Sequence, residues 1–321
     1  MLKRDFATPA DMALCRQMIR QGSKSFHLAS LLLPNSYREH ARALYGFCRM
    51  ADDLVDTANT PREAVVELAG RLDRIYEGAP SDNATDRAFA DLIHRFAIPR
   101  EIPDALIEGF AWDAEARHYD TLSDVTAYAV RVAGTVGVMM ALIMGERRPH
   151  VLARAIDLGV AMQFSNIARD VEADDAMNRV YLPANWLATC GSRSDVASKL
   201  VDEAERIYHQ AAAGIALLPR SCRASINAAR LLYREIGLEA KRTGHRSRAV
   251  VPFGRKLYLV SRAIATAPWL PSHMSQPCID EGQFLLDAVA QSAGPVSPYK
   301  GFAGQLDWVM KLFMAVEARK S

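Results

Sequence analysis

The fold of this chain is decided by one stretch of its sequence, Val160-Ala-Met-Gln-Phe-Ser-Asn-Ile-Ala-Arg-Asp-Val-Glu-Ala-Asp174. The stretch contains no proline or glycine, and good helix formers dominate it, so it is predicted to form one continuous helix. Its main polar side chains recur at steps of three or four residues and therefore share one face, namely Gln163, Asn166, Asp170 and Asp174. The rest of the helix is largely apolar, which indicates a buried helix whose polar stripe faces a cavity.

The two aspartates of this stripe predict a metal site. Buried carboxylates one turn apart repel each other and tend to take up a proton. A bound divalent cation is the simplest way to keep both of them ionised. Carboxylate oxygens favour Mg²⁺ or Mn²⁺, and the eight histidines form no zinc-binding pattern with one another or with cysteine.

The same design occurs a second time near the start of the chain, within Ala43–Asp56. Its polar positions again follow the helical period, and they are Tyr45, Arg49, Asp52 and Asp56. Arg49, like Arg169 of the first stretch, either grips phosphate with two hydrogen bonds or pairs with the neighbouring aspartates, and the two roles are compatible. The two helices are predicted to face each other across one pocket.

A single Asp-x-x-x-Asp pair would be weak evidence for such a site. With 37 acidic residues in 321 positions, chance alone yields about 4 acidic pairs at this spacing. Two pairs, each on an otherwise apolar helix and each continued along its stripe, favour a functional site over a solvated helix face.

Composition narrows the class of protein. Half of the residues are apolar, which allows a sizeable core, and the net charge of +2 gives no reason to expect nucleic acid as a partner. Five cysteines without CxxC spacing fit a reduced cytoplasmic protein. No signal peptide is visible, and the longest uncharged apolar run, Val132–Met144, is shorter than the ~20 residues that span a bilayer. We expect a cytoplasmic protein, with peripheral contact at the inner membrane surface as an open alternative.

Helical periodicity runs along most of the chain, and no segment alternates as a strand does. No long linker divides the chain, so a single all-α domain is predicted over residues 1–321. Gly134 and Gly137 predict a kink, or the close approach of a ligand, within an apolar helix. The helices expected are Ala10–Gln21, Ser36–Thr57, Arg62–Glu77, Thr85–Phe96, Pro103–His118, Ser123–Met144, Pro149–Asp174, Ser194–Leu217, Arg220–Arg242, Phe253–Ala267 and Phe302–Arg319.

Two further segments have alternative interpretations. Ser23 and Ser25 either bind phosphate oxygens from a loop or form an ordinary turn or helix cap. The apolar stripe of Phe302–Arg319 either packs into the core, which the pattern favours, or lies on a membrane surface. No GxGxxG or P-loop motif occurs, which argues against a Rossmann or P-loop nucleotide site.

Five blocks of the sequence resemble the squalene/phytoene synthase family, in particular the phytoene synthases of bacterial carotenoid pathways. The resemblance runs from about Gly22 to Leu259, and residues 270–321 form a variable C-terminal segment outside it. The blocks are Ser23-Lys-Ser-Phe26 with Leu33-Pro34, Tyr45-Gly-Phe-Cys-Arg-Met-Ala-Asp-Asp-Leu-Val-Asp56, Val132-Ala-Gly-Thr-Val-Gly137, Gln163-Phe-Ser-Asn-Ile-Ala-Arg-Asp-Val-Glu-Ala-Asp174 and Arg179-Val-Tyr-Leu-Pro183.

The resemblance implies an isoprenoid synthase fold, a helical bundle around a central cavity, with Mg²⁺ between substrate diphosphates and the aspartates. The implied metal ligands are Asp52, Asp56, Asp170 and Asp174, with Asn166 beside them. The residues implied to act on the diphosphates, directly or by supporting the second metal site, are Ser23, Ser25, Tyr45, Arg49, Gln163, Arg169 and Tyr181. The residues implied to line the prenyl channels are Phe26, Val132, Ala133, Val136 and Gly137.

The activity implied by the resemblance is the head-to-head condensation of two geranylgeranyl diphosphates. The reaction would pass through a cyclopropyl diphosphate to phytoene and release diphosphate. A squalene or dehydrosqualene synthase using farnesyl diphosphate is the alternative, and squalene formation would also need NADPH. A non-catalytic relative that binds lipid or assists assembly is a third possibility. The proton acceptor is left open between released diphosphate and a tyrosine.

The chain departs from the family pattern at two places. Glu172-Ala-Asp174 stands where the family usually has Gly-Glu-Asp, which keeps the aspartate spacing and loses the glycine. Phe164-Ser165 replaces the commoner Leu-Thr before Asn166. The second departure is expected to alter the shape of the channel and with it the preferred chain length.

Overall fold

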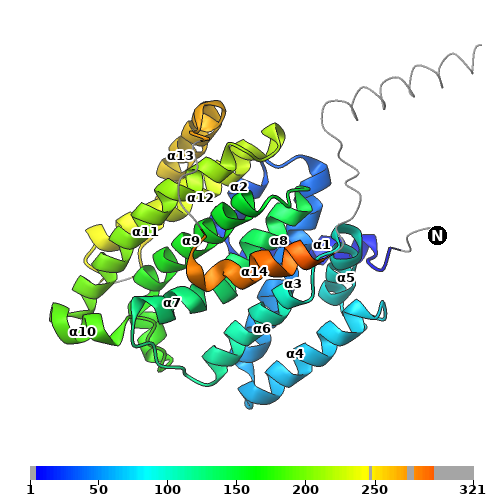
Figure 1. Ribbon diagram of the computed structural model, residues 1–321, viewed down its shortest axis with the longest axis horizontal. Coiled ribbons are helices and arrows are strands. Elements are labelled where there is room, and N and C mark those ends of the chain that lie inside the picture. The colour runs from blue at the N-terminus through cyan, green and yellow to red at the C-terminus, as the bar shows by residue number, and fades with distance from the viewer. Residues whose placement is uncertain (1–4, 246–247, 273–277, 293–321) are drawn as a thin grey trace, which may run out of the picture.

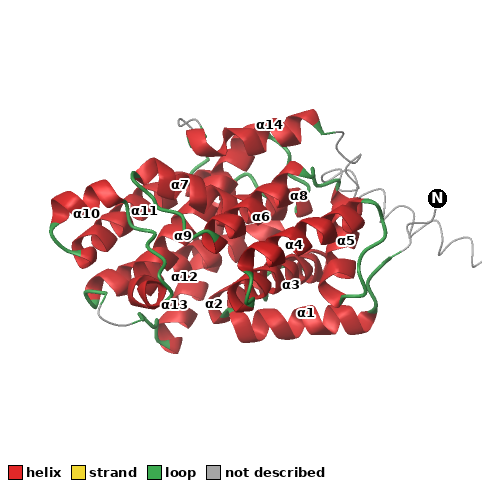
Figure 2. Cartoon of the chain, turned by 90° about the horizontal axis from the view of Figure 1, so that it is seen from below, coloured by secondary structure: helices red, strands yellow, loops and turns green. Residues whose placement is uncertain are grey.

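The computed structural model describes residues 5–245, 248–272 and 278–292. Within these ranges the regular secondary structure is helical throughout, with no strand, which confirms the predicted all-α fold (Figure 2). Most of the buried apolar side chains belong to one core, so the helices pack as layers around a common interior (Figure 1).

The helices follow the sequence periodicity closely. The first six are α1 Pro9–Gly22, α2 Lys24–Ser30, α3 Asn35–Thr57, α4 Pro61–Tyr76, α5 Ala84–Phe96 and α6 Glu101–Ala114. The apolar middle of the chain forms α7 Leu122–Ala129, a π-helical turn η1 Val130–Gly134, α8 Thr135–Ile143 and α9 Pro149–Ala176. The remaining elements are α10 Ala184–Cys190, α11 Arg193–Ile215, α12 Arg220–Arg242, α13 Phe253–Thr266, the 3₁₀ turns η2 Ala267–Trp269 and η3 Asp280–Gly282, and α14 Gln283–Gln291.

Several sequence expectations need correction. The helix expected over Pro103–His118 spans Glu101–Ala114, because Pro103 is tolerated in a first turn and the chain turns to positive φ at Ala116. The segment Gly22–Phe26 was expected to break the helical pattern, but its second half begins the short helix α2; α10 and α14 were not predicted. The helix predicted over Phe302–Arg319 lies outside the described residues.

The pair of glycines in the apolar middle of the chain is explained by a neighbouring helix. A Cβ atom on Gly137 would press into the carbonyl of Ala155 on α9, and one on Gly159 would press into the carbonyl of Ala133. The helix continues through the π-helical turn η1, which contains Gly134. The glycines therefore let η1 and α8 approach the backbone of α9.

The apolar stretch Leu122–Ile143 is a core element. In the described part of the chain it is the one helical stretch long and apolar enough to cross a membrane, and most of it is buried inside the protein. Helix α9 lies beside it and also packs against α7, α11, α12 and α14 (Figure 1). The first aspartate stretch thus belongs to the central helix of the molecule.

Candidate active site

A mostly apolar cavity of about 270 Å³ lies between α2, α3, η1, α8, α9, α11 and α12. Its lining includes every residue expected to border a prenyl channel, together with three of the expected polar residues: Phe26, Val132, Ala133, Val136 and Gly137, and Tyr45, Gln163 and Asn166. The two aspartate helices therefore border one cavity, as the sequence predicted. α3 contributes Tyr45 and Cys48 to its wall, and α9 contributes residues along much of its length.

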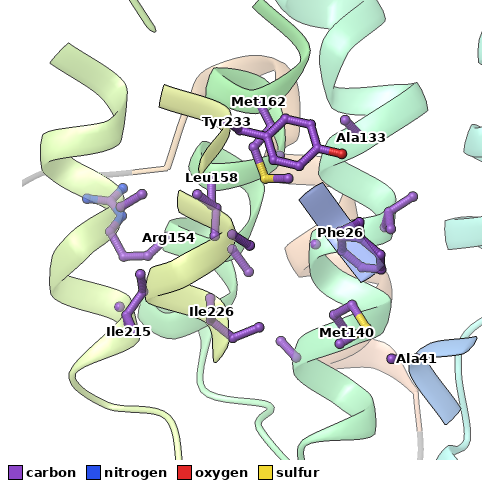
Figure 3. Close-up of a pocket in the computed structure, with 18 of the residues that line it drawn as sticks. Phe26, Ala41, Ala133, Met140, Arg154, Leu158, Met162, Ile215, Ile226 and Tyr233 are labelled. Carbon is purple, nitrogen blue, oxygen red and sulfur yellow. The ribbon is translucent and has the colours of Figure 1, made fainter. Parts of the chain in front are cut away.

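The cavity changes character along α9. Its lining on this helix begins at Val151 and ends at Gln163 and Asn166, which spans roughly 22 Å at the rise of an α-helix. In Figure 3, Met162 and Tyr233 lie towards one end, and Met140 and Ile215 lie towards the other. Asp170 and Asp174 follow on α9 beyond the polar end, so the long apolar part of the cavity leads towards the carboxylates.

Asn166, at the polar end of the cavity, has a side-chain oxygen without a hydrogen-bond partner. Its Oδ1 is buried and has no hydrogen-bond partner, while its Nδ2 donates weakly to Gln163 Oε1 at 3.4 Å. A buried acceptor without a partner costs about 1–3 kcal/mol. A residue in the wall of a cavity that keeps such an atom has the chemistry of a ligand-binding group.

The aspartates of α3 are compensated unequally. Arg179 donates to Asp56 Oδ1 at 2.8 Å, whereas Arg49 binds mainly Asp53, with Nε 3.0 Å from Oδ2, and lies 3.5 Å from Asp52. Burial in the concave site and the nearby charge of Asp56 raise the pKa of Asp52 to about 7, although 41% of its side chain stays open to solvent. The ion-pair role considered for Arg49 is thus present.

The aspartates of α9 show the same inequality. Asp170 accepts hydrogen bonds from Arg169, with Nε at 2.9 Å, and it pairs with Arg248, whose Nε lies 3.0 Å away. Burial and the charge of Asp170 raise the pKa of Asp174 to about 7. Both helices therefore carry one carboxylate that a further positive charge would stabilise.

Asp113, on α6, was missed by the sequence analysis. It accepts hydrogen bonds from Tyr181 at 2.7 Å and from Tyr128 at 2.9 Å, and the two tyrosine rings stack 4.8 Å apart. Burial raises the pKa of Asp113 to about 6, against the lowering effect of these hydrogen bonds. Its charge also contributes to the raised pKa of Asp52 and of Asp174, so it connects the two aspartate pairs.

In addition to Tyr45 of α3, a tyrosine of α12 lines the cavity. Tyr233 lines the cavity, and its hydroxyl lies 3.3 Å from Ser23 Oγ. Ser23 also caps α2 by accepting from the Phe26 amide at 3.2 Å, so the alternative of an ordinary cap is part of its role. Burial, with a smaller contribution from Tyr233, raises the pKa of Tyr45 to about 12 and keeps its hydroxyl protonated.

Several residues expected to shape the channel or bind the diphosphates lie outside the cavity lining, and they are Ser23, Ser25, Arg49, Phe164, Ser165, Arg169 and Tyr181. Ser25 is buried in α2, and Phe164 is fully buried on the far side of α9. Ser165 Oγ donates to the Ala161 carbonyl and lies 3.0 Å from the Tyr208 hydroxyl. The departure at Phe164-Ser165 therefore adjusts helix packing and has no direct contact with the channel.

The carboxylates fit a metal ion only if the ion finds further ligands. Among the described residues, no group of three or more His, Cys, Asp or Glu side chains converges closely enough to hold a metal ion alone. Mg²⁺ is typically bound by one or two carboxylates together with substrate phosphates and water. Two aspartate pairs with incomplete compensation and the free acceptor of Asn166 match that mode of binding.

A model of the squalene/phytoene synthase family matches residues 19–256. The chain belongs to the squalene/phytoene synthase family. Among relatives in this family, the phytoene synthase of Rhodobacter capsulatus is 48% identical over 279 residues, which cover 80% of this chain and 82% of the relative. The phytoene synthase of Cereibacter sphaeroides is 42% identical over 315 residues, covering 88% and 89% of the two chains.

The squalene/phytoene synthase fold is also found among solved structures. A dehydrosqualene synthase crystallised with a ligand is 29% identical, has a TM-score of 0.74, and matches over 80% of this chain and 96% of its own. The predicted family and the predicted isoprenoid synthase fold are both confirmed.

Proposed function

We propose that this protein condenses two geranylgeranyl diphosphates head-to-head to phytoene, as a prenyltransferase of carotenoid biosynthesis. The observation that carries the proposal is a single apolar cavity that leads at one end towards two aspartate pairs. Relatives named phytoene synthase, 42% and 48% identical over most of both chains, support this substrate and product.

Mg²⁺ is the proposed cofactor, with Mn²⁺ as a substitute. Asp52 and Asp56 would hold it on one side, and Asp170 and Asp174, with Asn166, on the other. When bound, the ion neutralises the charge that develops on the departing diphosphate. The raised pKa of Asp52 and of Asp174 supports this assignment, because a nearby cation favours the ionised form of each.

The side chains of the site divide the remaining work. Arg49, Arg169, Ser23 and Gln163 orient the two diphosphates, and Tyr45 donates a hydrogen bond from its protonated hydroxyl. The apolar wall keeps water from the allylic cation left after ionisation. The double bond of the second substrate attacks this cation, and loss of one proton closes the ring to give the cyclopropyl diphosphate. A second ionisation, rearrangement and proton loss then give phytoene.

The final proton is assigned to released diphosphate. Burial holds the pKa of Tyr45, Tyr128 and Tyr181 at or above about 12, so these hydroxyl groups are neutral and serve as donors. A neutral phenol is a poor general base, since it would have to become a cationic acid. Released diphosphate, beside the aspartate pairs, would carry oxygen atoms that can accept this proton.

The alternative substrate is farnesyl diphosphate, which would give dehydrosqualene or, with NADPH, squalene. The similarity to a dehydrosqualene synthase structure favours this alternative over other chemistry. A non-catalytic lipid-binding or assembly role is less favoured, because it gives no use for two pairs of partly buried carboxylates.

A product assay tests these proposals. Purified protein with Mg²⁺ is supplied with geranylgeranyl or farnesyl diphosphate, with and without NADPH, and the hydrocarbons are identified by mass. We expect a forty-carbon product without NADPH. A thirty-carbon product would replace the substrate and keep the site. No hydrocarbon from either substrate would overturn the proposed reaction in favour of the non-catalytic role.

We also propose a cytoplasmic location with peripheral contact at the inner membrane surface. Phe302–Arg319, for which a membrane-surface helix is the alternative to core packing, lies outside the described residues. Removing residues 302–321, followed by vesicle sedimentation, tests that segment directly.

A further inference from the structure

The largest concentration of exposed apolar side chains lies on and beside α13. Phe253 and Trp269 expose 70% and 84% of their surface, and Val250, Leu257 and Ile264 are also exposed. We call these five residues the α13 face. Phe253, Leu257 and Ile264 are spaced four and seven residues apart and share one side of the helix. An apolar stripe that points into solvent marks an interaction surface.

The opposite side of α13 is already occupied. Leu259 and Ala263 are buried against α12 and, with Ala29 of α2, form a separate small core. Asn227 of α12 donates to the Ala263 carbonyl at 3.1 Å and fixes the helix further. α13 is therefore firmly attached to the body of the protein, and its exposed stripe is a feature of the folded state.

Basic residues outnumber acidic ones in the sequence that contains the α13 face. Between Glu239 and Asp280 the sequence contains no acidic residue, and its basic residues there are Lys241, Arg242, Arg246, Arg248, Arg255, Lys256 and Arg262. Four of them are paired with carboxylates, namely Lys241 with Asp202, Arg242 with Glu239, Arg248 with Asp170 and Arg255 with Glu235. Lys256 instead lies near Lys24, and Arg262 lies near Arg230, so like charges gather beside the apolar stripe.

The α13 face also lies close to the cavity. α12 separates the two, because its residues Ile226, Ala229 and Tyr233 line the cavity and Ala229 also belongs to the small core beneath α13. Both views place α13 at the edge of the molecule, outside α12 (Figures 1 and 2). One helix thus lies between the exposed stripe and the space proposed for the prenyl chains.

We propose that the α13 face docks on the surface of a bilayer containing anionic phospholipid. Its apolar side chains would enter the boundary between headgroups and acyl chains, where tryptophan is favoured, and Lys256 and Arg262 would contact lipid phosphates. A second copy of this chain fits less well, because a two-fold contact would bring this basic surface against itself. The inference rests on the proposed peripheral membrane contact, for which it names the surface, and it does not depend on the proposed reaction.

Vesicle co-sedimentation of the full chain, without substrate, tests the proposal. We expect binding to phosphatidylcholine vesicles in which about one third of the lipid is phosphatidylglycerol, and much weaker binding to phosphatidylcholine alone. Replacing two residues of the face, Phe253→Ser with Ile264→Ser, is expected to lower the affinity more than tenfold. The matched control, Leu14→Ser with Val66→Ser, removes two exposed apolar side chains from α1 and α4 and is expected to bind as the wild type does.

A charge variant provides an independent measurement. Lys256→Gln with Arg262→Gln keeps the apolar stripe and removes two positive charges beside it. Each basic residue near an anionic surface contributes about fivefold, so we expect about 25-fold weaker binding to the anionic vesicles. This variant keeps the proposal testable if the serine variant fails to fold, which circular dichroism and the melting temperature report.

Three outcomes would overturn the proposal. One is wild-type vesicle binding by folded serine and charge variants. Another is loss of binding on deletion of residues 302–321 with no effect of either variant, which would assign the contact to that segment. A third is a wild-type dimer that the serine variant converts to monomer with no change on vesicles, which would assign the face to a second copy. Because the vesicle assay contains no substrate, its results test the α13 face whether or not the protein catalyses the proposed reaction.

Discussion

The aspartate pairs of α3 and α9 are compensated in opposite order along their helices. On α3 the second carboxylate, Asp56, is paired closely with Arg179, and the first, Asp52, has a raised pKa. On α9 the first carboxylate, Asp170, is held by arginines, and the second, Asp174, has the raised pKa. The uncompensated negative charge is therefore divided between two walls of one site. A cation bound by the carboxylates of only one helix would leave the uncompensated carboxylate of the other helix without a positive charge nearby.

The largest expected effect comes from removing one charge from either pair. Asp52→Asn and Asp170→Asn are each expected to lower turnover on the order of a thousandfold, because each removes a carboxylate proposed to hold the cation that stabilises departing diphosphate. The melting temperature should change little. Steady-state product formation is the measurement. Asp175→Asn, next to the α9 pair and bound to Arg193, is the control and should keep wild-type activity. Wild-type turnover in either motif variant would refute the metal assignment.

Asp113 provides a test of both aspartate pairs together, because its charge contributes to the raised pKa of Asp52 on α3 and of Asp174 on α9. Asp113→Asn is expected to weaken the activation by Mg²⁺ about 10- to 100-fold, since it removes a negative charge that acts on both aspartate pairs and would attract the cation. Tyr181→Phe removes one hydrogen bond to Asp113 and keeps its charge, so it should have the smaller effect. Titration of activity with Mg²⁺ separates the two variants, and equal effects would show that the charge of Asp113 is unimportant.

Helices α8 and α13 differ in how closely they pack at a glycine, which predicts a difference in the stability of two glycine-to-alanine variants. Gly137→Ala places a methyl group against the α9 backbone and is expected to cost about 1–3 kcal/mol of unfolding free energy. Gly254→Ala on α13 meets no atom and should be neutral or stabilising by up to about 1 kcal/mol. Chemical denaturation measures both. Equal stability of the two variants would contradict the close packing of α8 on α9.

The smallest expected effect concerns pH. The folded pKa values of Asp52 and Asp174, about 7, lie above the ordinary value of 3.8, so the folded protein binds these protons more tightly than the unfolded chain. Their contribution to stability is complete below about pH 4 and is lost as the pH rises through about 7. In metal-free protein, Asp52→Asn with Asp174→Asn should therefore raise the melting temperature relative to wild type by about 2–4 °C more at pH 8 than at pH 5. A difference that is constant with pH would contradict the raised pKa values.

The helices and one end of the site were predictable from local pattern. The period of apolar residues located α3 and α9, and the spacing of the aspartates placed both pairs on polar stripes that lead away from the cavity. Asp113 gave no such signal, since it is a single carboxylate near a helix end, and its partners Tyr128 and Tyr181 reach it only in the folded chain. Arg248 was missed for the same reason, because it meets Asp170 from a loop distant in sequence.

The close approach of η1 and α8 to α9, at Gly137 and Gly159, gives the cavity two walls that differ in how readily they accept substitutions. Where η1 and α8 meet α9, the lining includes Ala133, Gly137, Ala155 and Gly159, and a Cβ atom on either glycine would press into a main-chain carbonyl. The facing wall is built from larger side chains on α2, α3 and α12, among them Phe26, Tyr45 and Ile226. Substitutions that lengthen or shorten the product are therefore expected on the wall formed by α2, α3 and α12. The glycine positions between η1, α8 and α9 are expected to stay unchanged.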